Sequence, residues 1–114
     1  SIHQADTIRR VMTKENVKRL HALIVERGTY IHNKLPQHHA HPDGRIGIAH
    51  IYSVIKSVMG VPMKECRDSR VDDIIEIINY CVDNVKVMEG LTAPLHQKYA
   101  KEPKEVKVSL DAFF

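Results

Sequence analysis

The chain has 114 residues, of which 43% are hydrophobic, 27% are charged and 5% are aromatic, and its formal net charge is +3. These values predict one globular domain and exclude an intrinsically disordered chain. A membrane-spanning helix is also excluded, because no run of about 18 apolar residues occurs, and the N-terminal residues have no apolar signal-peptide core. We therefore expect a cytoplasmic protein with two reduced thiols, Cys66 and Cys81, the second of them in the core.

The first part of the chain predicts two helices. Residues 2–11 are compatible with a short helix, and Thr13 is a suitable N-cap for a longer one. In the longer helix the apolar residues recur at helical spacing, namely Val17, Leu20, Ile24, Ile31 and Leu35. We expect Gly28 to end or bend this helix and Pro36 to close it.

A loop rich in turn residues and histidine is predicted at residues 37–47. A helix is predicted to start near Asp43 and to end at Met59. Its apolar residues fall on one face, namely Ile48, Ile51, Ile55, Val58 and Met59. Gly60 is suited to the position just beyond a helix, and Pro62 follows it.

The next predicted helix runs from Val71 to a stop at Gly90. Ser69 followed by Asp72 resembles a capping box, with Asp in place of the usual Glu. The apolar stripe comprises Val71, Ile74, Ile75, Ile78, Val82, Val85 and Met88. Its β-branched residues would also suit a strand, but the length of the helical spacing favours a helix.

A short helical turn is predicted after Pro94, through Tyr99. Residues 101–114 are charged first and apolar last, and their alternating apolar residues predict an extended segment or short strand. Together these elements predict an all-α fold. We expect a bundle of four or five helices over residues 1–100, followed by an extended C-terminal tail over residues 101–114.

Acidic and amide side chains share one face of the predicted helix at 71–90. Asp72, Glu76, Asn79 and Asp83 step by four, three and four positions, and Asp73 flanks them. Clustered carboxylates repel one another unless a cation lies among them, and Mg²⁺ prefers hard oxygen ligands. The pattern leaves two interpretations open, a magnesium site and the solvated face of an amphipathic helix.

Residues 48–82 resemble small phage-type proteins related to the all-α nucleoside triphosphate pyrophosphatases (the MazG-like family). The resemblance rests on the segments AHIYSVIKS and RDSRVDDIIEIINYC. The residues that match the family's motifs are Lys56, Asp68, Ser69, Asp72, Asn79 and Tyr80.

The resemblance implies a helical core that binds a nucleotide with Mg²⁺. The implied metal ligands are Asp72, Asp73 and Glu76. The implied nucleotide-binding residues are Lys56 and Asn79. The family's upstream ExxE helix is missing, since Glu15 and Glu26 are too far apart to share a metal, so the resemblance implies a binding or degenerate member.

Histidine is frequent, with eight residues in the chain. His38, His39 and His41 lie in the predicted loop, and His50 follows on the next helix. Imidazole is a common ligand for borderline metals, but the spacing lacks the helical placement or cysteine partners of a zinc site. A metal-binding loop and a simply exposed loop both remain open.

The C-terminal segment KVSLDAFF resembles the peptides with which replication proteins bind a sliding clamp. In the eukaryotic and archaeal form of that peptide, Lys107 stands where a Gln is usual, while Leu110, Phe113 and Phe114 match. The T4-like phage form fits the residues from Ser109 to Phe114. One aliphatic and two aromatic side chains can fill an apolar pocket on a partner. The alternative is that both phenylalanines pack on the domain or on a second copy.

Three functions are compatible with these patterns. The first is a small phage-type accessory protein of nucleotide or DNA metabolism, a binding module whose tail docks a partner such as a sliding clamp. The second is a Mg²⁺-dependent nucleoside triphosphate pyrophosphohydrolase. The third is a regulatory homo-oligomer without a ligand site. No serine-nucleophile or phosphate-loop motif is present, and no membrane partner is expected.

Overall fold

The computed structural model describes residues 11–36 and 46–103 of the chain. Within these residues it has four α-helices, namely α2 (Lys14–Ile31), α3 (Gly47–Met59), α4 (Val71–Asp83) and α5 (Ala93–Lys98). Three 3₁₀ turns lie between them, namely η1 (His32–Lys34), η2 (Met63–Glu65) and η3 (Asp68–Arg70). No strand occurs in the described residues, so the prediction of an all-α helical bundle is confirmed. No helix in this part of the chain is long and apolar enough to cross a membrane.

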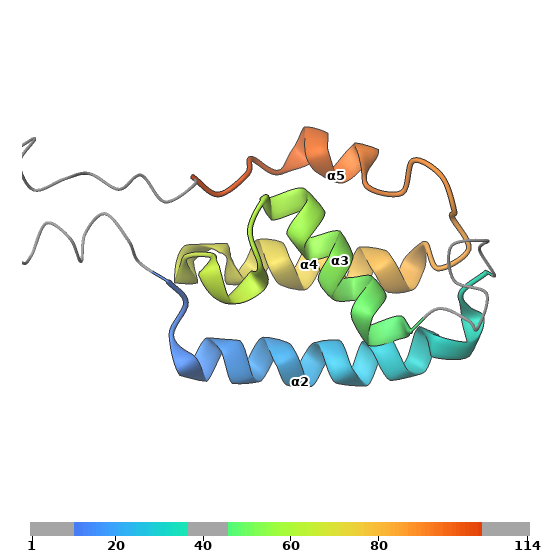
Figure 1. Ribbon diagram of the computed structural model, residues 1–114, viewed down its shortest axis with the longest axis horizontal. Helices are drawn as coiled ribbons and strands as arrows, with labels where there is room; N and C mark the ends of the chain where they lie inside the picture. The colour runs from blue at the N-terminus through green and yellow to red at the C-terminus, as the bar shows by residue number, and fades with distance from the viewer. Residues whose placement is uncertain (1–10, 37–45, 104–114) are drawn as a thin grey trace, which may run out of the picture.

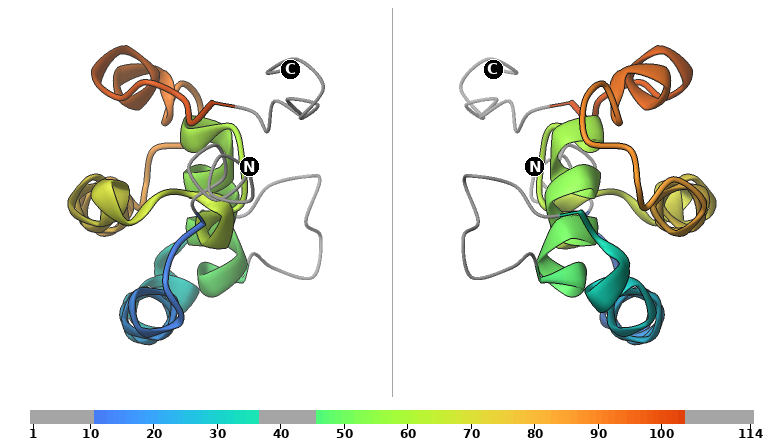
Figure 2. Two further views of the ribbon diagram at one scale, coloured as in Figure 1. Left: turned by 90° about the vertical axis from the view of Figure 1, so that its left-hand side faces the viewer. Right: turned by 90° about the vertical axis from the view of Figure 1, so that its right-hand side faces the viewer.

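The helices enclose one core of aliphatic side chains. α2 and α5 lie on opposite sides of the α3–α4 pair, as Figures 1 and 2 show. The largest side chains with almost no exposed surface are Leu20, Ile24, Ile31, Ile51, Ile55, Val58, Met59, Cys66, Ile74, Ile77, Ile78 and Cys81. The core position predicted for Cys81 is therefore confirmed. The described chain begins at Val11 and ends at Pro103 on the same side of the bundle (Figure 1).

The start of α2 is capped as predicted. The side chain of Thr13 accepts a hydrogen bond from the backbone N–H of Asn16, at 3.5 Å. Asp68 adds a second cap from a distant part of the chain. One of its carboxylate oxygens accepts from the backbone N–H of Thr13 at 2.8 Å and from the side-chain amide of Asn16 at 3.0 Å. These bonds attach the first turn of α2 to η3.

Gly28 does not end the helix, because α2 continues through it to Ile31. Gly28 is instead a point at which the backbone of α3 lies directly against α2. A Cβ atom placed on Gly28 would lie 2.7 Å from the Cα of Ile48, and one on Gly47 would lie 2.0 Å from the carbonyl oxygen of Gly28. Two glycines therefore allow the two backbones to touch.

α3 begins at Gly47 and so starts later than predicted, because Ile46 has an extended backbone. Its end agrees with the prediction. Gly60 has a φ of 79° and donates its backbone N–H to the carbonyl of Lys56 at 2.8 Å. Such left-handed residues commonly terminate helices because they satisfy a free carbonyl.

α4 begins at Val71 as predicted, but its N-terminal cap and its end differ from the prediction. No side chain caps its start, which follows directly from η3, so the capping box of Ser69 and Asp72 does not form. The helix ends at Asp83 rather than near Gly90. The side-chain amide of Asn84 donates to the carbonyl of Tyr80 at 3.0 Å and so takes up a helical acceptor. Consequently Met88 is 47% exposed and does not join the predicted apolar stripe.

The short helix predicted around Pro94 is present as α5. Leu95 of α5 and Tyr99, its C-cap residue, are buried in the core. The Tyr80 hydroxyl, on α4, donates to the carbonyl of Leu91 at 2.8 Å. This bond holds the connection between α4 and α5 against α4. The predicted helix at residues 2–11, apart from Val11, lies outside the described residues, as does the predicted tail beyond Pro103.

Candidate functional site

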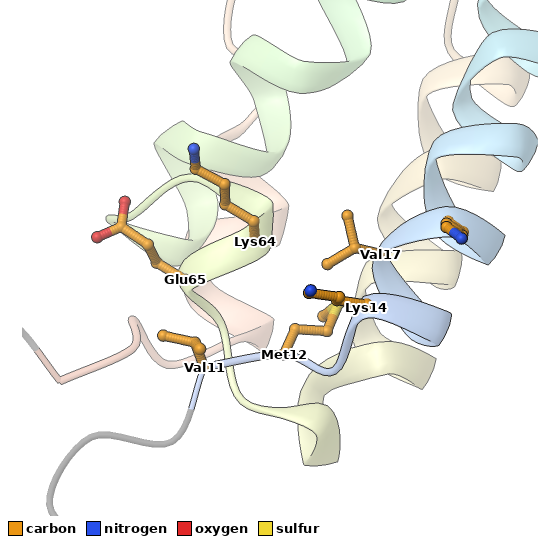
Figure 3. A pocket seen from close by; sticks show the side chains of 7 residues that line it. Val11, Met12, Lys14, Val17, Lys64 and Glu65 are labelled. Atoms are coloured by element: carbon orange, nitrogen blue, oxygen red, sulfur yellow. The ribbon is translucent and has the colours of Figure 1, made fainter.

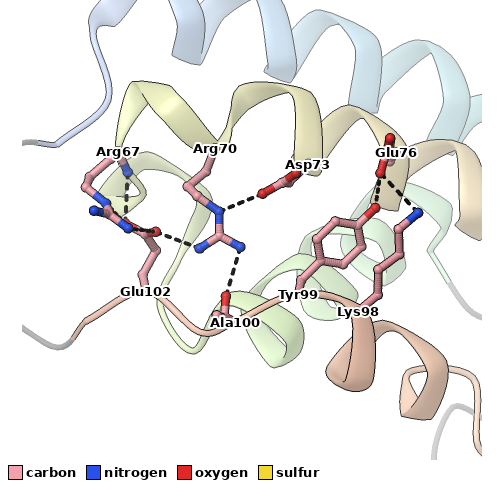
Figure 4. A network of polar contacts seen from close by, with 8 residues as sticks. All are labelled: Arg67, Arg70, Asp73, Glu76, Lys98, Tyr99, Ala100 and Glu102. Atoms are coloured by element: carbon pink, nitrogen blue, oxygen red, sulfur yellow. Dashed lines mark hydrogen bonds and ion pairs between the residues drawn. The ribbon is translucent and has the colours of Figure 1, made fainter.

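A buried carboxylate joins the end of the described chain to the start of α4, as Figure 4 shows. The side chain of Glu102 is 3% exposed, and its two oxygens accept four hydrogen bonds. Three come from the backbone N–H, Nε and Nη2 of Arg67, at 3.0–3.1 Å. The fourth comes from Nη1 of Arg70 at 2.7 Å. Glu102 is thus part of the domain, although it lies beyond the predicted boundary at residue 100.

Arg70 is the centre of this network. Its side chain is 10% exposed, and it also donates through Nη2 to the carbonyl of Ala100 and through Nε to Asp73, both at 2.8 Å. Burial raises the pKa of Glu102, but the hydrogen bonds from Arg67 and Arg70 outweigh it and hold that pKa below its ordinary value. The network therefore keeps a charged carboxylate inside the protein. No local pattern in the sequence marks Glu102 as buried.

Both cysteine thiols are buried in the core. Burial, reinforced by the charge of Glu102, raises the pKa of Cys66 to about 11. Burial raises the pKa of Cys81 to about 12. The thiolate, which is the reactive form, is therefore scarce at neutral pH.

The three residues predicted as magnesium ligands have different neighbours. Asp73 pairs with Arg70, whereas Asp72 is exposed in the first turn of α4. Glu76 accepts a hydrogen bond from the hydroxyl of Tyr99 and pairs with the ammonium group of Lys98 at 3.4 Å (Figure 4). Hydrogen bonds from Tyr99 and Lys98 lower the pKa of Glu76. No group of three or more His, Cys, Asp or Glu side chains in the described ranges is placed to hold a metal ion, and the magnesium site stays a prediction.

Three residues of the predicted acidic face do meet in one pocket. This pocket between α4 and α5, of about 410 Å³, is lined by Glu76, Asn79, Tyr80, Asp83, Pro94, Leu95, Lys98 and Tyr99. Two carboxylates, an amide and an ammonium group can together bind a small polar ligand. The helical spacing predicted the shared face, but nothing in the sequence indicated that Lys98 and Tyr99 would form its opposite wall.

Lys56, the other residue predicted to bind a nucleotide, does not line the pocket that contains Asn79. It lies on α3 at a second pocket, of about 680 Å³, lined by Ile46, Ile48, Ala49, Tyr52, Ser53, Lys56, Pro62 and Met63. The lining is mainly apolar, with Lys56 as its charged member. The structure therefore does not bring Lys56 and Asn79 together in one pocket.

Three of the described histidines, His21, His32 and His96, contact different partners. His21 contacts the hydroxyl of Tyr52 through Nδ1, and Nδ1 of His32 accepts the backbone N–H of Gly47 at 3.2 Å. His96 pairs with Ser57 at 3.3 Å. The three histidines of the predicted metal-binding loop, His38, His39 and His41, lie outside the described residues.

A third pocket opens between the first turns of α2 and η2 (Figure 3). We call it the basic groove. It measures about 690 Å³ and is lined by Val11, Met12, Lys14, Val17, Lys18, Lys64 and Glu65. Its floor is apolar and its rim carries three lysines and one acidic residue. The spacing of Lys14, Val17 and Lys18 was a signal in the sequence for one wall of this groove.

The residues predicted to bind a partner, Leu110, Phe113 and Phe114, lie outside the described residues. Lys98, Tyr99 and Glu102 are the site residues that sequence reasoning missed. Comparison of the chain with family models, with curated proteins and with solved structures finds no match.

Proposed function

We propose that this chain is a protein-binding module, a small phage-type accessory protein of nucleotide or DNA metabolism. Its helical domain carries a partner-binding segment at residues 104–114. In this proposal Leu110, Phe113 and Phe114 are the apolar anchors, and a sliding clamp is the partner.

The observation that supports this proposal best is the buried pairing of Glu102 with Arg67 and Arg70. The chain is attached to the domain one residue before Pro103, and the candidate segment begins directly after that proline. An extended chain spans about 3.3 Å per residue, so this attachment limits how far a partner bound at residues 104–114 would lie from the domain. One aliphatic and two aromatic side chains are a suitable set for an apolar pocket on a partner.

The test is binding of the full chain to purified sliding clamps of the T4-like phage and archaeal types, measured by surface plasmon resonance. Replacing both phenylalanines (F113A/F114A) is expected to weaken binding at least about tenfold, because apolar anchors of this kind dominate peptide affinity. The matched control, V106A/V108A, removes apolar atoms from the same segment at positions that the motif does not specify and is expected to leave affinity unchanged. Equal binding by F113A/F114A and the parent chain, or no binding to either clamp, would contradict the proposal.

The pocket between α4 and α5 favours a second candidate function. Glu76, Asn79 and Lys98 could contact a nucleotide and its Mg²⁺ there, as a nucleoside triphosphate pyrophosphohydrolase requires. Lys98 already pairs with Glu76, so a metal would have to displace an existing contact.

In this second candidate, E76Q is expected to abolish pyrophosphate release while leaving the fold intact. Outer-shell partners of a metal are already worth about 10- to 100-fold in activity, so a direct ligand should be worth at least as much. The measurement is calorimetric titration with nucleoside triphosphates and Mg²⁺, with product analysis on the same samples. F113A/F114A is the matched control and should retain activity. Binding without turnover would support nucleotide binding but not catalysis. The absence of both binding and turnover would exclude this candidate.

A further inference from the structure

We propose that the basic groove binds an acidic segment of a second protein, one that carries a large apolar side chain as its anchor. This proposal concerns a different surface from residues 104–114 and does not depend on the function proposed for them. It follows from the shape, the lining and the charges of the groove.

The floor of the groove is apolar and open. Val11 is 48% exposed, whereas Met12 is 5% exposed and forms the base of the groove. Met12 donates its backbone N–H to the carbonyl of Lys64 at 3.4 Å, so this segment runs beside η2 while Val17 faces it from α2 (Figure 3). An open apolar hollow of about 690 Å³ is large enough for an aliphatic or aromatic side chain.

The rim of the groove is positively charged. Lys14 and Lys18 lie one turn apart on α2, and Lys64 stands on η2 across from them. Within the described ranges none of the three forms an ion pair, whereas Lys98 elsewhere in the molecule pairs with Glu76. Among the described residues that line the groove, Glu65 is the one acidic member. An acidic ligand would therefore be attracted by charge and held by its apolar anchor.

The neighbouring pocket indicates that the bound segment is longer than one anchor. η2 contributes Lys64 and Glu65 to the basic groove and Met63 to the pocket beside Lys56. A chain that crosses η2 therefore meets two apolar hollows, and Lys56 adds a further positive charge. Ile46, which lines the second hollow, is 60% exposed. An acidic segment with two apolar residues fits this surface.

The lining favours a peptide over a nucleic acid. Single-stranded nucleic acids bind through a basic track combined with aromatic side chains on which the bases stack. None of the described residues that line the basic groove is aromatic. Its floor of valine and methionine side chains suits an apolar side chain instead.

The probe is a random library of twelve-residue peptides, selected against the immobilised full-length protein. We expect the enriched peptides to be acidic and to share one or two large apolar residues. Affinity of an enriched peptide is then measured by fluorescence anisotropy for the parent chain and for K18Q/K64Q. The variant is expected to bind at least about tenfold more weakly, because two positive charges at the contact are lost.

The matched control is K34Q/K86Q, which removes the same two charges away from the groove and is expected to keep the parent affinity within about twofold. The proposal is overturned if the two variants weaken binding equally, since the attraction would then be general. It is also overturned if enrichment fails, or if a single-stranded oligonucleotide competes and the acidic peptides do not. Tighter peptide binding by the full-length variant L110A/F113A/F114A would show that the chain's own tail occupies the groove.

Discussion

Glu102→Gln is expected to lower the free energy of unfolding by about 2 kcal/mol, because it removes one of the two carboxylates, those of Glu102 and Asp73, that pair with the buried guanidinium of Arg70. The substitution keeps the shape of the side chain but replaces an acceptor of four charge-assisted hydrogen bonds with a neutral amide. The loss measures the cost of breaking the pair rather than the net value of having it. Urea-induced unfolding followed by circular dichroism at pH 7 gives the difference directly.

The control for this prediction is Glu65→Gln, which removes one exposed carboxylate from η2 and is expected to change stability by no more than about 0.5 kcal/mol. The pH dependence provides an independent check. Because the pKa of Glu102 is lowered in the folded state, its contribution is present above the ordinary carboxyl pKa of about 4.3 and is lost as the pH falls through the lowered value.

The acid limb of the stability curve should therefore be shallower in the Glu102→Gln variant than in the parent chain. Some loss of stability at acidic pH should remain in the variant. Hydrogen bonds from the backbone of Thr13 and the side chain of Asn16 also lower the pKa of Asp68, and the pKa of Glu76 is lowered as well. Equal stability of the variant and the parent at pH 7 would mean that the end of the described chain is not held by this pair.

Gly47→Ala is expected to destabilise the protein by about 1–3 kcal/mol, which is the usual cost of overpacking a well-packed contact. The added Cβ would lie 2.0 Å from the carbonyl oxygen of Gly28, which is backbone and cannot move aside alone. α2 and α3 would have to separate. The expected sign is the reverse of the general rule, since alanine in place of glycine within a helix usually stabilises by about 0.5–1 kcal/mol.

Ser53→Ala is the matched control for the glycine contact. Ser53 lies on the exposed face of the same helix, where alanine meets no backbone and has the better helix propensity. Thermal unfolding should show a lower midpoint for Gly47→Ala and an unchanged or slightly higher one for Ser53→Ala. A Gly47→Ala variant as stable as the parent would show that the two helices do not touch at their glycines.

Features that depend on neighbouring residues in the chain could be predicted from the sequence. The all-α fold follows from helical spacing of apolar residues, and the cap at Thr13 and the left-handed Gly60 follow from local hydrogen bonding. The shared face of Glu76 and Asn79 also follows, because 3.6 residues per turn bring these positions together.

Other features were decided by contacts between distant parts of the chain. Gly28 looked like a helix breaker, but packing of α3 against it makes glycine a requirement within a continuous helix. α4 stops at Asp83, and the connection that follows is held by a hydrogen bond from the Tyr80 hydroxyl to the carbonyl of Leu91.

Charge pairing was the least predictable feature. Glu102 lies in a charged stretch that looked like solvated tail, and only Arg67 and Arg70, more than thirty residues earlier, make its burial favourable. A sequence pattern predicts which residues share a helix face. The partner that neutralises a charge is brought close only by tertiary folding, because the energy of a buried carboxylate depends on the cations around it in space.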